Sequence, residues 1–392
     1  MNETPTANRM HIAFFGKTNS GKSTLINTLT GQNISLVSPV SGTTTDPVRK
    51  AMELLPIGPV VLIDTAGLDD TSELGPQRIQ KTDEIIKKTD LAVLVIASGD
   101  RNLALEREYL KKFREAGTPV IAFFNRFGEE MPEEGAPESL GVPCLVASAQ
   151  DSQAMAGLKE LMIQHADYDF ESPSICGDLV KEGDVVILVM PQDIQAPKGR
   201  LILPQVQVTR DLLDLKCRVV SVTTNDLGPM LKLLVNPPAL VITDSQVFGQ
   251  VNKVLPPEIR LTSFSILMAK YKGDIHEMVR GARAIESLTP ADKVLIMEAC
   301  THHAQKGDIA REKLPALLRK RIGEGLTVDV FSGTGFPDRV GEYQLILHCG
   351  GCMLNRKGML AKTAMAAKAG VPITNFGTAL AYLNGILERV VY

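Results

Sequence analysis

The sequence has no tryptophan, and aromatic residues make up only 5% of its 392 residues. It therefore offers few of the ring platforms on which single-stranded nucleic acids stack. An excess of one charge is also missing, because 42 Lys and Arg face 45 Asp and Glu and leave a net charge of −3. No basic field points to nucleic acid or to an anionic membrane, and we expect neither as a partner.

Long apolar runs are absent as well. The longest, such as Leu91–Ala97 and Val185–Met190, fall far short of the ~18 residues that span a bilayer. Residues 1–9 are polar and lack the apolar core of a signal peptide. We therefore expect a cytoplasmic protein whose six cysteines stay reduced and either bind a metal or lie buried.

Short apolar runs alternating with helical segments dominate the sequence, which is typical of α/β folds with mainly parallel sheets. In the first part these runs include HIAFF, VVLID, LAVLVIA and VIAFFN. Further strand candidates follow a polar linker near 171–177, and a third α/β unit begins near 264–273. We predict three domains, over 1–173, 174–262 and 263–392, the last two being smaller α/β domains.

One motif of the first part is typical of phosphate binding. Residues 16–23, GKTNSGKS, fit the pattern GxxxxGK[ST], follow an apolar strand and open a helix. Such glycines allow a loop whose N–H groups bind phosphate oxygens, while Lys22 supplies a charge and Ser23 a Mg²⁺ ligand. The motif DTAG at Asp64–Gly67 and the string SGTTTD at 41–46 add a metal-binding carboxylate and a threonine hydroxyl. This part is predicted to bind a nucleoside triphosphate.

These motifs resemble the translation-factor-like GTPases, nearest to the group of tRNA-modification and ribosome-assembly GTPases. The resemblance implies GTP and GDP as ligands, GTP hydrolysis as activity, and Leu68 where Ras-like proteins have a water-orienting glutamine. Asn19 matches an asparagine that holds an activating K⁺ in some members, although a loop-ordering role fits it equally well. The implied catalytic residues are Lys22, Thr44, Asp64 and Gly67. The implied nucleotide-binding residues are Gly16, Asn19, Ser20, Gly21, Lys22, Ser23, Thr24, Asn125, Ser148 and Ala149, with Ser23 and Thr44 as Mg²⁺ ligands.

The guanine-reading string NKxD of that group is altered here. The chain reads Asn125-Arg-Phe-Gly128, so the aspartate that accepts from guanine is missing. Losing its charged hydrogen bonds, worth ~1.5–3 kcal/mol each, should weaken base discrimination. Glu129 or Glu130 would substitute if the loop shifted. The preference for GTP therefore comes from the resemblance alone.

Cysteines and histidines gather in the third part, as Cys300-Thr-His302 and His348-Cys349-Gly-Gly-Cys352. Cys300 and Cys349 each end an apolar strand, and parallel strands place their carboxyl ends on one edge of the sheet. Three thiolates with imidazoles suit an iron–sulfur cluster, and tetrahedral zinc fits the same spacing. We interpret Cys144, Cys176 and Cys217, His11, His165 and His276, and Met353, Met359 and Met365 as structural.

A GTPase followed by this pattern resembles the FeFe-hydrogenase maturation GTPases over essentially the whole chain. The resemblance implies a P-loop GTPase domain over 1–173, a dimerisation domain over 174–262 and an iron–sulfur cluster-binding domain over 263–392. It implies a homodimeric scaffold or carrier whose Cys300, Cys349 and Cys352 ligate a 4Fe–4S cluster. It implies delivery of a diiron precursor, made by two radical-SAM maturases, to the FeFe-hydrogenase apoprotein. His302, His348 and Glu298 are candidates for the fourth ligand. Alternatives are a ribosome- or tRNA-associated GTPase with a zinc module and a metallochaperone for another metalloenzyme.

Overall fold

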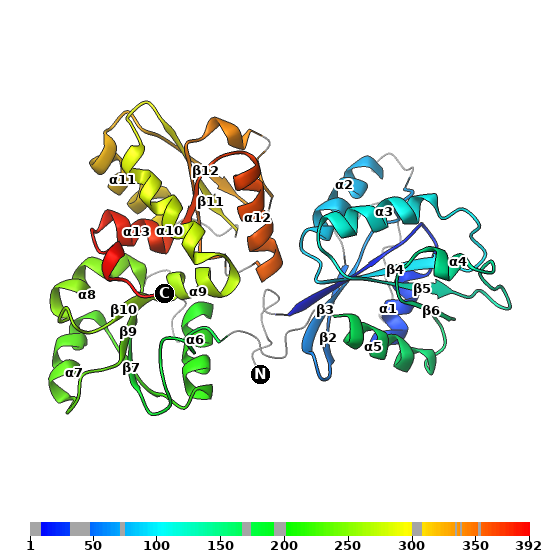
Figure 1. The fold of residues 1–392 in the computed structure, drawn as a ribbon, viewed down its shortest axis with the longest axis horizontal. Coiled ribbons are helices and arrows are strands. Elements are labelled where there is room, and N and C mark those ends of the chain that lie inside the picture. The colour runs from blue at the N-terminus through cyan, green and yellow to red at the C-terminus, as the bar shows by residue number, and fades with distance from the viewer. Residues whose placement is uncertain are drawn as a thin grey trace. The chain divides into compact units, whose positions relative to one another are not determined.

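The computed structural model describes residues 9–31, 48–70, 75–166, 174–191, 201–299, 308–333, 335–337, 339–351 and 354–392. The chain divides into two compact units, 1–170 and 171–392 (Figure 1). Each unit has its own sheets and its own buried clusters of apolar side chains.

The first unit is built on a six-stranded sheet in the order β2-β3-β1-β4-β5-β6. Neighbouring strands are parallel except β2 and β3, which pair antiparallel. The strands are β1 Met10–Phe15, β2 Val48–Leu54, β3 Gly58–Asp64, β4 Leu91–Ala97, β5 Val120–Asn125 and β6 Cys144–Ala147. The apolar runs of the sequence form β1, β4 and β5, which are buried along nearly their whole length because the sheet is covered on both faces.

Helices cover both faces of this sheet (Figure 1). Successive strand residues point to opposite faces, so Ile12 and Phe14 join one apolar cluster and Ala13 and Phe15 another. The first cluster includes residues of α1 Lys22–Thr30 and α5 Ala154–His165, and the second includes residues of α2 Gly75–Ile86 and α3 Ala104–Glu115. A single turn, α4 Ala136–Ser139, precedes β6.

The second unit contains two four-stranded sheets in which all neighbouring strands are parallel. The first has the order β10-β9-β7-β8 and the second β12-β11-β13-β14. Their strands are β7 Val185–Val189, β8 Arg218–Val222, β9 Leu240–Thr243, β10 Leu261–Ser263, β11 Lys293–Glu298, β12 Thr327–Ser332, β13 Leu345–His348 and β14 Ile373–Asn375.

Helices follow most strands of the second unit, but two helices follow β10 and, among the described residues, only a 3₁₀ segment lies between β12 and β13. The helices are α6 Leu203–Asp214, α7 Leu227–Leu233, α8 Phe248–Val254, α9 Phe264–Lys272, α10 Ile275–Arg283, α11 Leu314–Ile322, α12 Arg356–Lys368 and α13 Phe376–Leu383. Short 3₁₀ segments are η2 Thr224–Asp226, η3 Ser245–Val247, η4 Ala284–Ser287, η6 Val340–Glu342 and η7 Leu387–Arg389, and a π-helical turn, η5 Ile309–Lys313, precedes α11.

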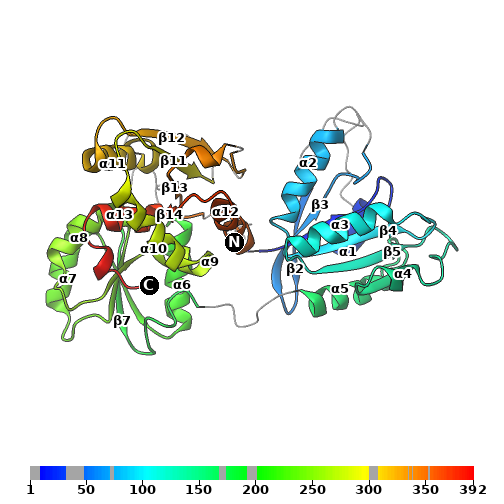
Figure 2. The same cartoon turned by 45° about the horizontal axis from the view of Figure 1, so that its top comes forward.

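The two sheets of the second unit share one core. Helices α9, α10 and α13 lie between them, and a single apolar cluster takes side chains from both sheets (Figure 2). The C-terminal residues also return to the first of the two sheets, where the N–H of Val391 donates to the carbonyl oxygen of Leu261 at 2.9 Å. A boundary near residue 262 therefore stays a prediction.

The predicted fold class is confirmed: a larger α/β sheet is followed by two smaller, mainly parallel ones. Among the described residues, no helix is long and apolar enough to cross a membrane.

Candidate functional site

The phosphate-binding motif forms the loop between β1 and α1. Gly16 and Gly21 have φ angles of 154° and 97°, which side chains with a Cβ rarely adopt. A Cβ on Gly16 would lie 2.1 Å from the carbonyl oxygen of Val95, and one on Gly21 would lie 2.1 Å from Nδ2 of Asn125. Both glycines are thus required by backbone conformation and by close neighbours.

Lys22, the first residue of α1, is 7% exposed. Its Nζ donates to the carbonyl oxygens of Gly16 (2.9 Å) and Lys17 (2.8 Å). Burial lowers its pKa, while the charges of Asp64 and Asp69 act in the opposite direction. The ammonium group is held inside the loop, where it can bind an anion.

Ser23 and Asp64, the expected magnesium residues, lie side by side. The Ser23 hydroxyl donates to Oδ2 of Asp64 at 2.5 Å. The other oxygen, Oδ1, is buried and has no hydrogen-bond partner among the described residues. Burial raises the pKa of Asp64 despite the Ser23 hydrogen bond and the charge of Lys22. A buried, unsatisfied carboxylate oxygen beside a hydroxyl suits a hard divalent cation.

Asn125, which ends β5, connects two loops of this site. Its Nδ2 donates to the carbonyl oxygen of Ser20 at 2.9 Å, and its Oδ1 accepts from the N–H of Ala149 at 2.8 Å. The neighbouring Ser148 accepts from the N–H of Gln150 at 3.3 Å. Asn125 therefore ties the phosphate loop to the Ser148–Ala149 loop, which brings these predicted nucleotide residues together.

The position of the missing aspartate is occupied by Gly128, which has a φ of 68°. Glu130 lies with its carboxylate beside Gly99, where an added Cβ would meet Oε2 at 2.6 Å. Gly99 follows β4, whereas the Ala149 loop follows β6, and β5 separates these two strands. Glu130 thus lies on the opposite side of β5 from the supporting loop, while Glu129 is exposed.

The segment after Asp64 packs against the phosphate loop. Leu68 donates its N–H to the carbonyl oxygen of Gly16 at 3.1 Å, and its side chain is only 3% exposed within the apolar core. A Cβ on Gly67 would lie 2.2 Å from Oγ1 of Thr18. The buried Leu68 side chain cannot orient water, in line with the apolar substitution seen in the sequence.

Asp69 makes a contact that we did not predict. Its Oδ1 accepts from the N–H of Thr18 at 2.6 Å and from the Thr18 hydroxyl at 2.9 Å. Partial burial acts to raise the pKa of Asp69, but these hydrogen bonds outweigh it and leave the pKa below its usual value. A carboxylate thus occupies one N–H group of the phosphate loop. The sequence signal for this contact was the acidic pair Asp69-Asp70, which follows DTAGL.

Other predicted nucleotide residues are placed as follows. Ser20 is buried with no hydrogen-bond partner for its hydroxyl in the described part of the chain, and Asn19 and Thr24 are exposed. Asn19 has a φ of 60°, a loop conformation that asparagine tolerates. Thr44 lies outside the described residues.

The second candidate site lies where β11 and β13 end side by side. In the register of this pair, Met297 is opposite His348. The N–H of Cys349 donates to the carbonyl oxygen of Met297 at 2.9 Å, and the N–H of Ala299 donates to Sγ of Cys349 at 3.2 Å. Cys300 follows Ala299 in the sequence. Cys300, His302 and Cys352 lie outside the described residues.

His348 is fully buried beside this cysteine. Its Nδ1 is 2.6 Å from the carbonyl oxygen of Cys349, and since a carbonyl only accepts, Nδ1 carries the proton. Nε2 then carries a lone pair, and this nitrogen has no hydrogen-bond partner among the residues described. Burial, aided by the charge of Lys362, lowers the pKa of His348 to about 4. The imidazole is neutral at physiological pH, as metal ligation requires.

Glu298, the third candidate for the fourth ligand, is 4% exposed at the end of β11. Its Oε2 accepts from Nη2 of Arg311 (3.2 Å) and from the Ser332 hydroxyl (3.1 Å). This oxygen is therefore held by an ion pair. Within the described ranges, no group of three or more His, Cys, Asp or Glu residues could hold a metal ion.

Two buried lysines next to this site were also missed by the sequence analysis. Lys272 binds carbonyl oxygens of the loop after Cys349, and Lys362 binds the carbonyl oxygen of Gly335. No pattern in the sequence distinguishes them from surface lysines. By contrast, burial raises the pKa of Cys176 and Cys217, and raises that of Cys144 to about 11, so these thiols stay protonated at neutral pH.

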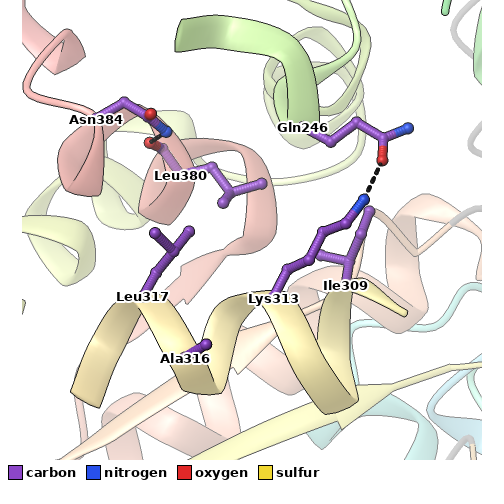
Figure 3. A pocket seen from close by; sticks show the side chains of 7 residues that line it. All are labelled: Gln246, Ile309, Lys313, Ala316, Leu317, Leu380 and Asn384. Carbon is purple, nitrogen blue, oxygen red and sulfur yellow. Dashed lines mark hydrogen bonds between the residues drawn. The ribbon is translucent and has the colours of Figure 1, made fainter. Parts of the chain in front are cut away.

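A cavity of about 380 Å³ lies elsewhere in the second unit, between η5–α11, α13 and η3 (Figure 3). Its polar groups already have partners: Lys313 donates to Oε1 of Gln246 at 2.9 Å, and Asn384 donates to the carbonyl oxygen of Leu380 at 2.7 Å. The rest of the lining is aliphatic, so we assign no chemistry to this cavity.

Comparisons with known families divide the chain into three segments. Residues 11–126 match the family described as 50S ribosome-binding GTPase, residues 175–273 match the hydrogen maturase F dimerization domain, and residues 276–392 match the hydrogen maturase F tetramerization domain. The two hydrogen maturase segments together cover more than half of the chain.

The tRNA modification GTPases among the curated relatives match the GTPase part of the chain. The tRNA modification GTPase MnmE of Chromobacterium violaceum is 32% identical over 160 residues, which is 41% of this chain and 35% of that protein. The protein of the same name from Clostridioides difficile is 32% identical over 120 residues, covering 30% and 26% of the two chains. The chain thus spans about a third of the length of the curated relatives it matches.

Solved structures give weaker likenesses. A point variant of Aquifex aeolicus Era bound to GDP and AlF₄⁻ is 17% identical with a TM-score of 0.35, covering 57% of this chain and 98% of that one. The G domain of the T. maritima FeoB iron transporter is 22% identical with a TM-score of 0.33, covering 41% of this chain and 100% of that one. Because a GTPase domain precedes adjoining dimerization and tetramerization domains of hydrogen maturase F, the chain belongs to the hydrogen maturase F family of hydrogenase maturation GTPases.

Proposed function

We propose that this protein is a GTP-hydrolysing scaffold or carrier that binds a 4Fe–4S cluster and delivers a diiron precursor to the FeFe-hydrogenase apoprotein. The precursor is cargo received from two radical-SAM maturases. One observation carries the proposal: the Ala299 N–H donates to the Cys349 sulfur where β11 and β13 end, so the segment leading into Cys300 reaches Cys349. N–H groups that donate to ligand sulfurs are typical of iron–sulfur sites.

The nucleotide part of the proposal rests on chemistry present in the first unit. Lys22 binds phosphate oxygens, the N–H groups of the loop support it, and Ser23 and Asp64 hold Mg²⁺, which neutralises charge on the phosphates when bound. The unsatisfied Oδ1 of Asp64 fits this cation. Leu68 faces the apolar core and cannot orient water. A K⁺ ion held by Asn19 would supply positive charge near the phosphates, where an arginine finger does so in other GTPases.

The cluster part rests on the donor set of the second unit. Three thiolates, Cys300, Cys349 and Cys352, leave one iron position for a fourth ligand, and we assign that ligand to His348 over Glu298. His348 offers a buried, unpartnered Nε2 on a neutral imidazole, whereas Glu298 is bound by Arg311 and Ser332. A single ligand other than a thiolate would leave one iron position open to exchange, which acceptance of an iron-containing cargo needs.

The nucleotide acts in this proposal as a switch that changes the release of partners and has no part in making the cluster. γ-Phosphate and Mg²⁺ would order the loop of Thr44 and so alter a surface that partners contact. A Lys22→Ala variant that still exchanges partners with normal, nucleotide-sensitive kinetics would contradict this role.

Oligomerisation is the remaining element, and the family descriptions of both later domains support it. Helix α6 and the two residues before it present an apolar stripe to solvent beside the edge strand β8. Its members are Leu201 (50% exposed), Ile202 (37%), Val206 (47%) and Leu213 (51%). Positions 206 and 213 lie on one face of the helix. We assign this stripe to the dimer contact within residues 175–273.

Anaerobic reconstitution with iron and sulfide tests the proposal. The wild type should bind about four irons and show absorption and EPR spectra of a 4Fe–4S cluster, and Cys300→Ala, Cys349→Ala and Cys352→Ala should each abolish them. Cys144→Ala is the matched control and should bind iron normally. Colourless protein that binds only zinc would overturn the assignment and favour a GTPase with a zinc module.

A further inference from the structure

A buried lysine holds the loop that carries the C-x-x-C cysteines. Lys272 is the last residue of α9, and its side chain is 2% exposed. Its Nζ donates to the carbonyl oxygens of Gly351 (3.2 Å) and Leu354 (3.0 Å). These two residues bracket Cys352 in the sequence, Gly351 directly before it and Leu354 two residues after it.

Backbone conformation and packing at Gly351 direct its carbonyl to the ammonium group. Gly351 has a φ of 61°, and a Cβ there would lie 2.6 Å from Sδ of the buried Met359 on α12. The carbonyl oxygen of Gly351 also accepts from the N–H of Leu354 at 2.9 Å. Lys272 thus binds the backbone on both sides of Cys352 in the sequence.

A second ammonium group lies close to the same edge of the sheet. Lys362 of α12 is 4% exposed and donates to the carbonyl oxygen of Gly335 at 2.7 Å, and its charge acts on the ring of His348. Burying a charge is unfavourable unless opposite charge or strong hydrogen bonds compensate it. A cluster held by three thiolates is anionic, so a buried ammonium group beside its ligand loop would stabilise it.

We propose that Lys272 is a positioning residue for the cluster, which fixes the backbone on both sides of Cys352 and raises the cluster's reduction potential through its positive charge. The inference rests on the proposed 4Fe–4S site. Outer hydrogen bonds and nearby charge orient metal ligands and tune potentials in general, and removing a positive charge disfavours the more negative, reduced cluster.

Three substitutions separate position from charge. Lys272→Gln keeps a hydrogen-bond donor without the charge, Lys272→Met removes both, and Lys272→Arg keeps both. The control is Lys270→Gln on the same helix, where the lysine forms an ion pair with Asp178 nearer the surface. Iron per chain, an EPR-monitored redox titration and the melting temperature of the metal-free protein are measured after anaerobic reconstitution.

We expect Lys272→Gln to retain most of its iron and to show a more negative potential. At the wild-type midpoint, the ratio of reduced to oxidised cluster should fall about tenfold, which is about 59 mV for one electron. Lys272→Met should show the same shift and lose at least half of its iron, whereas Lys272→Arg and Lys270→Gln should resemble the wild type.

An unchanged potential in both Lys272→Gln and Lys272→Met would overturn the inference. A Lys272→Arg variant that behaves like Lys272→Met would also overturn the inference, because the lysine would then serve only as packing. The comparison of these two variants also tests the inference if Lys272→Met has a lowered melting temperature. A wild type without iron would instead overturn the proposed function, so the two failures are distinct.

Discussion

The nucleotide site of the first unit and the cysteine site of the second unit are built alike. Each lies at the carboxyl edge of a parallel sheet, and each has a buried lysine bound to carbonyl oxygens of its ligand loop. Lys22 binds the carbonyls of Gly16 and Lys17, and Lys272 binds those of Gly351 and Leu354. In both sites the loop itself partly compensates the buried ammonium charge.

The two sites differ in where that lysine comes from. Lys22 lies five and six residues from the carbonyls that it binds, inside one continuous motif. Lys272 lies 79 and 82 residues from its carbonyls and belongs to a helix that packs between two sheets. The lysine of the phosphate loop is therefore held by its own motif, whereas the lysine at the cysteine loop depends on the packing of α9.

The largest effect should come from Lys22→Ala, which removes the phosphate-binding charge and leaves the second unit untouched. Charged hydrogen bonds are worth ~1.5–3 kcal/mol each, so losing two should weaken GTP binding about a thousandfold. Titration calorimetry measures the binding, and iron analysis of the reconstituted protein should show no change. Lys111→Ala, an exposed change on α3, is the control. If Lys22→Ala halved the iron content, the two sites would not be independent.

Gly21→Ala should damage the first unit nearly as strongly. A Cβ at a φ of 97° would also lie 2.1 Å from Nδ2 of Asn125, the residue that connects two loops. We expect about 3 kcal/mol of destabilisation, measured by urea unfolding. Gly31→Ala is a matched control, because Gly31 has a φ of 64° but nothing within 4 Å of the new Cβ, and it should cost about 1 kcal/mol. Equal losses would mean that the Asn125 contact is unimportant.

The same contrast between local and distant residues explains what could be predicted. Apolar runs placed β1, β4 and β5, and the ends of two parallel strands brought Ala299, next to Cys300, against Cys349. The phosphate loop followed from one motif. The sequence could not reveal that Lys272 binds backbone carbonyls, since every residue offers a carbonyl and only the packing of α9 selects two of them.

Residue roles were harder to predict than residue positions. Asn125 was expected beside the base, and its amide proves to be used by Ser20 and Ala149, which fixes the loops on which base reading depends. Glu130 was a candidate for the missing aspartate, and it lies across β5 from the Ala149 loop, beside Gly99. Both outcomes depend on side-chain directions that a one-dimensional pattern does not contain.

Val206→Glu tests whether assembly belongs to the second unit. If the apolar stripe of α6 forms the dimer contact, a charge at its centre removes about 2 kcal/mol of apolar burial, so dimer dissociation should become about 30-fold more favourable. Sedimentation equilibrium measures it. Leu233→Glu on α7 makes the same change at a residue that is 76% exposed outside the stripe and should have no effect. Dissociation by the Leu233 variant alone would move the contact to α7.

The smallest expected effect concerns Asp69 of the first unit. Its carboxylate accepts from the N–H of Thr18, a phosphate-loop donor, so it competes with a phosphate group for that donor. Asp69→Asn removes the negative charge, and the ratio of GTP to GDP affinity should rise about three- to fivefold, since surface charge terms are below about 1 kcal/mol. Asp70→Asn is the control and should leave the ratio unchanged.

The pH dependence of the ratio of GTP to GDP affinity gives a second test of the Asp69–Thr18 contact. Because the pKa of Asp69 lies below its usual value, the contact is fully present above about pH 4 and is lost only as the pH falls through that lowered pKa. The difference in this ratio between the wild type and Asp69→Asn should therefore stay constant between about pH 6 and 8. An Asp69→Asn variant that lowers the ratio would show that Asp69 assists phosphate binding. The phosphate loop would then need a distant acidic residue just as the cysteine loop needs a distant lysine, and the difference between the two sites would disappear.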